Sequence, residues 1–169
     1  IDADRVFATF YSFAPDESGG QDWVVGLGVE RGGELHIDEW ISARGGAFGA
    51  GPEATAIEQF PWGRGVIRFG DCHNAVAELS GPDSHRGFAF RLQRLTAVPG
   101  LGCDAPGTVR SPGLAGSWFV PERPGEGWLL SPSGDREWVV SWYTFDADGD
   151  RRWLIGTAEV DDEGVLRAP

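Results

Sequence analysis

Tryptophan and tyrosine are the side chains of this chain best suited to hold a ligand. The 169-residue sequence contains eight Trp and two Tyr. Large aromatic rings mostly fill protein cores, but in a β-rich domain a cluster of them also lines ligand pockets or offers a flat face to a sugar ring. The sequence therefore predicts a ligand-binding site built from six aromatic residues, which are Trp118, Trp128, Tyr143, Trp153, Tyr11 and Trp23.

Histidine chemistry has little support in the sequence. His36 and His73 have no convincing partner, so general acid–base catalysis by either residue is not predicted. Asp83, Ser84 and His85 follow one another directly, whereas the members of a catalytic triad come from separate elements and meet only in the folded chain. These three residues are better interpreted as a polar loop.

Carboxylates are numerous, with 26 Asp and Glu in total. Glu122, Glu126 and Glu137 lie near aromatic segments, where two of them could form the carboxylate pair of a glycoside hydrolase. The acidic residues are concentrated in turn-like segments, however, and solvated turns are the better interpretation. No catalytic residue is assigned, and a hydrolase is the most distant functional hypothesis.

Two motifs imitate cofactor sites but fit turns better. In DADGD, residues 146–150, Gly149 is fourth, whereas a calcium-binding EF-hand loop needs Gly sixth and Glu twelfth. Asp-Gly between two alternating apolar runs is instead a strong hairpin signal. GLGVERGG, residues 26–33, is followed by a strand-like run and not by the helix that a phosphate loop requires. We predict no cofactor and no metal ion.

The two cysteines, Cys72 and Cys103, leave three interpretations open. A disulfide is favoured, and it predicts an oxidising location, either secreted, periplasmic or at the cell surface. Two buried free thiols are the second interpretation. A zinc site that adds His73 and His85 has suitable ligands, but it lacks the close paired spacing of structural zinc motifs.

Charge and composition exclude several classes of protein. The net charge of −12, with 26 acidic and 14 basic residues, argues against a nucleic-acid partner. Apolar runs stay shorter than the roughly 18 residues of a membrane span, so no membrane insertion is predicted. The first residues, IDADRVFATF, lack the features of a signal peptide and do not begin with Met, which predicts a processed product or a fragment.

Apolar residues alternate with a period of two along most of the chain, which is typical of β-strands. Residues 5–13 and 137–145 are apolar on both faces, as expected of strands covered on two sides. The only helix candidate is 52–60. The predicted fold is therefore all-β, an antiparallel barrel or closed sandwich with at most one short helix. The further strand candidates are 22–30, 34–41, 65–69, 75–79, 87–95, 116–120, 127–131 and 152–160.

One hairpin pattern occurs twice, in residues 9–26 and 141–156. Two strands are expected before the second copy, and four or five strands are expected after the first copy only. The chain therefore holds the C-terminal portion of one β repeat unit in residues 1–104, a linker in 105–115 and the N-terminal portion of a second unit in 116–169. The corresponding residues are Tyr11 and Tyr143, Phe13 and Phe145, Trp23 and Trp153, and Gly26 and Gly156.

Each incomplete unit is expected to leave an open sheet edge, and open edges associate unless they are covered. The favoured closure folds residues 116–169 back onto the N-terminal part of the same chain, forming one barrel. The alternative is strand exchange with a neighbouring chain.

Several segments resemble a proteobacterial family of secreted β-rich repeats. The segments are GSWFVPERPGEGW, WYTFDADGDRRWLIG, GGAFG and PWGRGVIRFGDCHNA, together with the RLQRL and GLGC pieces before the linker. The resemblance implies a β-rich fold, a bridge between Cys72 and Cys103, and no catalytic residues. The first hairpin departs from the pattern, because FAPDESGG stands where a short Asp-x-x-Gly turn is expected. The G-x-W opening is also similar to that of avidins and lipocalins.

These observations together predict a non-catalytic, secreted or cell-surface β module that binds a small molecule or carbohydrate through aromatic residues. A self-associating structural repeat completed by strand exchange is the alternative.

Overall fold

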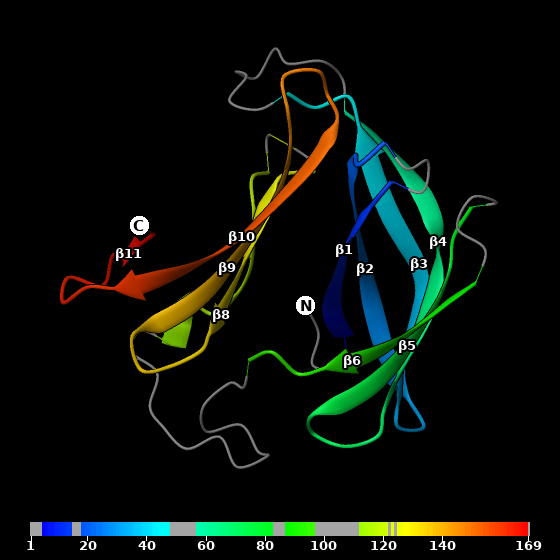
Figure 1. Cartoon of the computed structure of the whole chain (residues 1–169), viewed down its shortest axis with the longest axis horizontal. Helices are drawn as coiled ribbons and strands as arrows, with labels where there is room; N and C mark the ends of the chain where they lie inside the picture. Colours follow the sequence, from blue (N-terminus) through cyan, green and yellow to red (C-terminus); the bar gives the residue numbers. More distant parts are fainter. Residues whose placement is uncertain are drawn as a thin grey trace.

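The chain folds into two antiparallel β-sheets. In this computed structural model, the described residues are 5–14, 18–47, 57–82, 87–96, 112–121, 123 and 125–168. The two sheets curl and lie beside each other, and β10 of the second sheet contacts β2 of the first (Figure 1). The all-β antiparallel prediction is confirmed.

The first sheet contains six strands in chain order, each paired with the next. They are β1 (Arg5–Phe13), β2 (Gln21–Arg31), β3 (Glu34–Arg44), β4 (Glu58–Phe69), β5 (Asn74–Ser80) and β6 (Phe88–Gln93).

The second sheet contains five strands in the order β11-β10-β9-β8-β7. They are β7 (Gly116–Phe119), β8 (Gly127–Pro132), β9 (Glu137–Phe145), β10 (Arg151–Val160) and β11 (Leu166–Arg167). No backbone ladder joins the two sheets within the described residues.

The helix candidate at 52–60 is replaced by strand where it is described. Glu58, Gln59 and Phe60 begin β4 and pair with Arg44, Ala43 and Ser42 of β3. Backbone pairing with β3 outweighs the weak helix preference of residues 58–60. The rest of the candidate lies outside the described residues. Within the predicted linker, Pro112–Leu114 form a single 3₁₀ turn.

The first sheet curls around its own apolar core. Phe10 of β1 and Phe90 of β6 come within 5.6 Å, measured between ring centroids, although these two strands do not pair. The curl therefore brings the two edges of the sheet toward each other. The buried residues of this core are Val24, Leu35, Ile37, Trp40, Trp62, Ala77 and Leu79.

The opposite face of the β1–β2 hairpin packs against the second sheet. The buried residues of this second core are Trp23, Ala43, Tyr143 and Phe145. Residues 22 to 24 of β2 are buried in succession, so this part of the strand is covered on both faces.

The predicted DADGD turn is confirmed. Residues 146–150 connect β9 to β10, and one oxygen of the Asp146 carboxylate accepts hydrogen bonds from the backbone N–H groups of Asp148 and Asp150 at 2.9 and 3.0 Å. Gly149 adopts a positive φ of 85°, a conformation that glycine tolerates and other residues adopt with strain. The Asp146 carboxylate thus stabilises the turn by hydrogen bonds to its backbone.

In the described part of the chain, none of the elements is a helix long and apolar enough to cross a bilayer.

Candidate functional site

The two copies of the hairpin have the same register. In the first copy Tyr11 lies opposite Trp23, and in the second copy Tyr143 lies opposite Trp153. Cross-strand neighbours share one face of a sheet, so each hairpin presents a Tyr and a Trp side by side. The duplication seen in the sequence is therefore also a duplication of local geometry.

These two aromatic faces pack against each other. Trp23 lies 5.2 Å from Tyr143, and Trp153 lies 6.0 Å from Tyr11, both between ring centroids. The Trp of each copy thus meets the Tyr of the other. We call this contact the junction, formed by Tyr11, Phe13, Trp23, Tyr143, Phe145 and Trp153.

Phenylalanine contacts at the junction are reciprocal as well. Trp23 lies 5.8 Å from Phe145 with an interplanar angle of 64°. Trp153 lies 5.6 Å from Phe13 with an angle of 62°. Both are edge-on arrangements, which aromatic rings prefer over face-to-face stacking.

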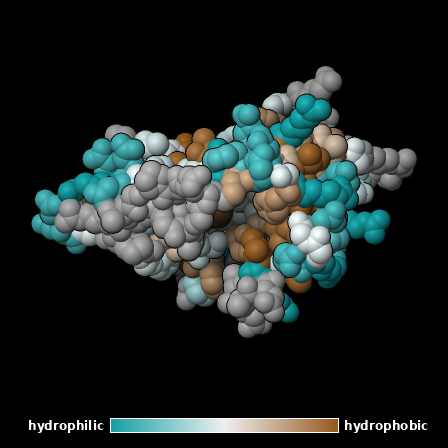
Figure 2. All heavy atoms as spheres, turned by 90° about the horizontal axis from the view of Figure 1, so that it is seen from below, coloured by the Kyte–Doolittle hydropathy of each residue, from teal (hydrophilic) through white to brown (hydrophobic). Residues whose placement is uncertain are grey.

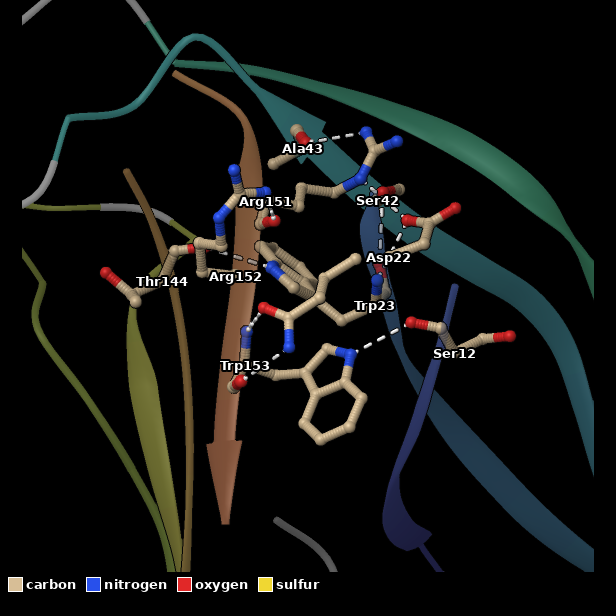
Figure 3. Close-up of polar contacts among 10 residues, drawn as sticks. Ser12, Asp22, Trp23, Ser42, Ala43, Thr144, Arg151, Arg152 and Trp153 are labelled. Carbon is tan, nitrogen blue, oxygen red and sulfur yellow. Dashed lines mark hydrogen bonds and ion pairs between the residues drawn. The ribbon is translucent and has the colours of Figure 1, made fainter. Parts of the chain in front are cut away.

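The two indole N–H groups also bond reciprocally. Trp23 Nε1 donates to the backbone carbonyl of Thr144 at 3.2 Å, and Trp153 Nε1 donates to the carbonyl of Ser12 at 2.9 Å (Figure 3). Thr144 follows Tyr143, and Ser12 follows Tyr11, so the acceptors occupy equivalent positions in the two copies. An approximate two-fold relation therefore connects the hairpins.

Polar contacts at the margin of the junction break this symmetry. Arg151 Nε lies 2.6 Å from the Asp22 carboxylate, and its Nη1 donates to the Ala43 carbonyl at 3.2 Å (Figure 3). Gln21 occupies the position equivalent to Arg151, and its side-chain amide accepts from the Trp153 N–H and donates to the Trp153 carbonyl. The Gln21 amide thus substitutes for a strand partner at that point of β10.

Glycines make room for the Phe145 ring. A Cβ atom built at Gly46 would overlap the Phe145 ring, and one at Gly125 would lie 2.8 Å from it. Gly125 also has a positive φ of 90°. The GGAFG segment therefore contributes a position without a side chain, which lets Phe145 insert between the sheets.

Burial raises the pKa of both tyrosines. The pKa of Tyr143 rises to about 12, first because burial disfavours the phenolate and second because a charge on Tyr11 would lie nearby. The pKa of Tyr11 is raised by burial and is partly lowered again by the nearby polar side chains of Thr9 and Ser141. Both phenols are therefore neutral at ordinary pH.

The structure brings four of the six predicted ligand-binding residues together, but in a core. Trp23 and Tyr143 are 2% and 6% exposed. Tyr11 and Trp153 are half-buried beside them. These four side chains contact one another across the sheets, so their faces are occupied by protein.

The other two predicted residues, Trp118 and Trp128, lie elsewhere. Trp118 and Trp128 are cross-strand neighbours. With Trp142 and Leu154 they form one row of paired residues across four strands, which we call the Trp118 row. Trp128 stacks on Trp142 at 5.6 Å and 16°, and Trp118 is 48% exposed. Because adjacent residues of a strand point to opposite faces, this row lies on the face of the second sheet turned away from the junction.

A cleft beside the junction was not predicted from the sequence. It has a volume of about 930 Å³ and is lined by Phe13, Phe60, Arg44, Arg151 and Arg152, among others. Arg44 forms an ion pair with Glu58 at 2.8 Å, and Arg152 forms one with Asp146. Each of these arginines therefore already has a carboxylate partner. No local motif could have indicated the cleft, because its lining comes from both sheets.

A second, more apolar cavity of about 660 Å³ lies at the β4–β5 turn, where Phe69 and Cys72 meet Leu92 of β6. Figure 2 shows hydrophobic residues gathered on the lower face, over the half of the molecule that contains the first sheet. Several large apolar side chains of this sheet are exposed, among them Phe69 and Leu92.

Glu126, one of the carboxylates considered for catalysis, has structural partners. Glu126 is buried, bonded to Arg123 at 2.8 Å and to the Thr144 hydroxyl at 3.0 Å. Among the described residues, no cluster of three His, Cys, Asp or Glu side chains could hold a metal ion. Glu122, Asp83, Ser84, His85 and Cys103 lie outside the described residues, as do most of the linker and the ends of the predicted units.

The fold and the junction define a two-sheet, all-β module. The sequence matches no family model, no curated protein and no solved structure.

Proposed function

We propose that this chain is a non-catalytic structural repeat module, in which the junction holds two β units of a secreted or cell-surface protein in a fixed orientation. The reciprocal junction contacts carry the proposal. Two copies of one surface that contact each other around a two-fold axis make every contact twice. The Trp–Tyr, Trp–Phe and indole–carbonyl contacts each occur twice between the sheets.

The energy of the junction is large enough for this role. Aromatic pairs contribute about 0.5 to 1.5 kcal/mol each beyond area burial, and a buried hydrogen bond contributes about 1 kcal/mol. Four ring contacts and two indole hydrogen bonds therefore contribute several kcal/mol, which is comparable to the net stability of a typical domain.

The proposal is tested by removing one ring from each copy and measuring the shape of the chain. We expect the Tyr11→Ala/Trp153→Ala double variant to keep its β circular dichroism while its radius of gyration in small-angle X-ray scattering increases. Trp118→Ala, away from the junction, is the control and should change neither quantity. An unchanged radius of gyration in the double variant would contradict the structural role.

Ligand binding is the second candidate, favoured by the exposed face of Trp118. Trp118 lies opposite Trp128, which stacks on Trp142, and such a row of aromatic residues can stack against a sugar ring or a flat small molecule. Binding on a glycan array that Trp118→Ala abolishes without loss of fold would support this function. Equal binding by the variant would oppose it.

We also propose that the chain belongs to the secreted repeat family and lies outside the cytoplasm. Both proposals rest on the family motifs in the sequence and on the predicted bridge between Cys72 and Cys103. The described residues contain no free cysteine. Cys103 lies outside them, so this pairing remains a prediction.

A further inference from the structure

The two copies of the hairpin have different neighbours. In the first copy, β2 pairs along most of its length with β3, where Val25 lies opposite Ile41 and Gly26 lies opposite Trp40. In the second copy, β10 pairs on that side only with β11 among the described residues, at Glu159 and Val160. Within the described part of the chain, the edge of β10 that corresponds to the β3 side of β2 is therefore largely open.

Side chains next to this edge are exposed where their counterparts are buried. Leu154 is 52% exposed, whereas the equivalent Val24 is 2% exposed. Ile155 is 53% exposed, whereas the equivalent Val25 is partly buried against the junction core. Aliphatic residues flank the open edge on both faces, as they do at edges that accept another strand.

Gly156 is the second and independent observation. At the equivalent Gly26, an added Cβ would lie 2.6 Å from Ile37 Cγ2 and 2.9 Å from the Glu39 carbonyl, so the approach of β3 requires glycine there. At Gly156 an added Cβ would meet nothing within 4 Å. Glycine weakens a strand interior, and it often marks a place where another backbone approaches closely.

We propose that the open edge of β10 accepts an added antiparallel strand with the side-chain pattern of β3, supplied by a separate polypeptide. Backbone groups of Ile155 and Thr157 would pair with the incoming strand, and its bulky residue would lie over Gly156. This is strand addition, in which the backbone supplies affinity and alternate side chains supply specificity. The inference extends the proposed structural role, because it adds a third contact to a module that already joins two units.

The unpaired part of the β10 edge is bounded at both ends by groups that already occupy it. Gln21 occupies the edge at Trp153, and β11 occupies it from Glu159 onward. Residues 154–158 remain. By analogy with β2, the incoming strand places the residue equivalent to Ile41 opposite Ile155 and the residue equivalent to Trp40 opposite Gly156. Ala158 stands where the first copy has Gly28, and its methyl group restricts the side chain that can lie beside it.

The test uses the full chain and a fluorescent peptide with the β3 sequence IDEWIS, residues 37–42, which covers the unpaired part of the β10 edge but does not reach the positions that β11 occupies. We expect saturable binding in an anisotropy titration. Gly156→Val should weaken binding by at least about tenfold, because its side chain overlaps the incoming strand. The variant should keep or raise the melting temperature, because valine suits an exposed strand position better than glycine.

Ser80→Val is the matched control, because it places valine at an exposed strand position of β5 in the first sheet, away from the edge of β10, and it should leave binding unchanged. A peptide of the same composition in scrambled order should not bind. Absence of binding by the β3 peptide would overturn the proposal, and so would equal binding by Gly156→Val. Because Gly156 lies outside the junction, these results are independent of the shape measurement that tests the structural role.

Discussion

Tyr11 and Tyr143, the only tyrosines of the chain, lie on opposite sides of the junction. Each contacts the tryptophan of the other hairpin copy. Their phenol groups share a poorly hydrated region, and a negative charge on one would oppose a charge on the other. Ionisation of either phenol would therefore weaken the contact between the sheets.

Alkaline pH should weaken the fold through Tyr143. Its folded pKa of about 12 exceeds the ordinary value of 10.0, so the folded chain retains a proton that the unfolded chain loses. Where the folded state binds more protons, stability falls as pH rises. We expect the unfolding free energy to be insensitive to this group below about pH 10 and to decrease progressively between about pH 10 and 12.

Urea unfolding at several pH values measures this effect, with Tyr143→Phe as the test variant. In this variant the unfolding free energy should decrease less at alkaline pH than in the parent chain. The Tyr11→Phe/Tyr143→Phe double variant should show a still smaller decrease, because the pKa of Tyr11 is also raised. If the unfolding free energy fell equally with pH in Tyr143→Phe and the parent chain, the assignment of this effect to Tyr143 would be refuted.

The two indole hydrogen bonds should be matched in energy. Trp23→Phe and Trp153→Phe keep an aromatic ring but remove the N–H that bonds to Thr144 or Ser12. We expect each variant to lower the unfolding free energy by about 1 to 3 kcal/mol, because a buried carbonyl loses its donor and the smaller ring packs less well. A loss in only one variant would show that the two halves of the junction are not equivalent in energy.

At the scale of elements, one turn design occurs twice in the second sheet. Asp146 and Asp161 each begin a five-residue turn, and one carboxylate oxygen accepts two backbone N–H groups within it. The backbone N–H of each Asp also bonds to the carbonyl four residues later. The hydrogen bonds donated within its turn, that from Val165 above all, lower the pKa of Asp161.

These turns should differ in their effect on the whole fold. Asp146→Ala is expected to lower the unfolding free energy by about 1 to 2 kcal/mol, because two N–H groups lose their acceptor and the start of β10 is no longer held against the junction. Asp161→Ala loosens only the pairing of the two-residue β11. Hydrogen exchange should therefore increase across β9 and β10 in the first variant and near β11 alone in the second. Equal exchange patterns would contradict this difference.

At the scale of the whole molecule, the sheets share side-chain contacts but no backbone ladder within the described residues. The first sheet has an apolar core of its own, whereas the second, in the part of the chain that the structure describes, leaves the Trp118 row and the edge of β10 open. The second sheet therefore depends on the junction more than the first does.

A bridge between Cys72 and Cys103 would bind the segment after β6 to the β4–β5 turn. Closing a loop of roughly 30 residues contributes about 3 to 4 kcal/mol in the chain-entropy account. We expect intact-mass measurement to show a gain of about two daltons on reduction, and thermal unfolding to shift to lower temperature with it. Labelling of both thiols in the native, unreduced protein would refute the bridge.

The sequence by itself determined most of the strands, their turns and the duplication, because these depend on local patterns. The start of β4 at Glu58–Phe60 is an exception, because pairing with β3 overrides the local helix preference. Alternation with a period of two places residues on a face, and Asp-Gly segments such as 146–150 turn the chain wherever they occur. The packing of the two hairpin copies against each other could not be derived in this way. The indole contacts join residues 121 and 141 positions apart, and only the packing of the sheets selects which apolar faces meet. Tertiary structure likewise decided that Gly26 is enclosed and Gly156 is open. The two glycines are alike in the local sequence pattern, but only Gly26 has β3 packed beside it.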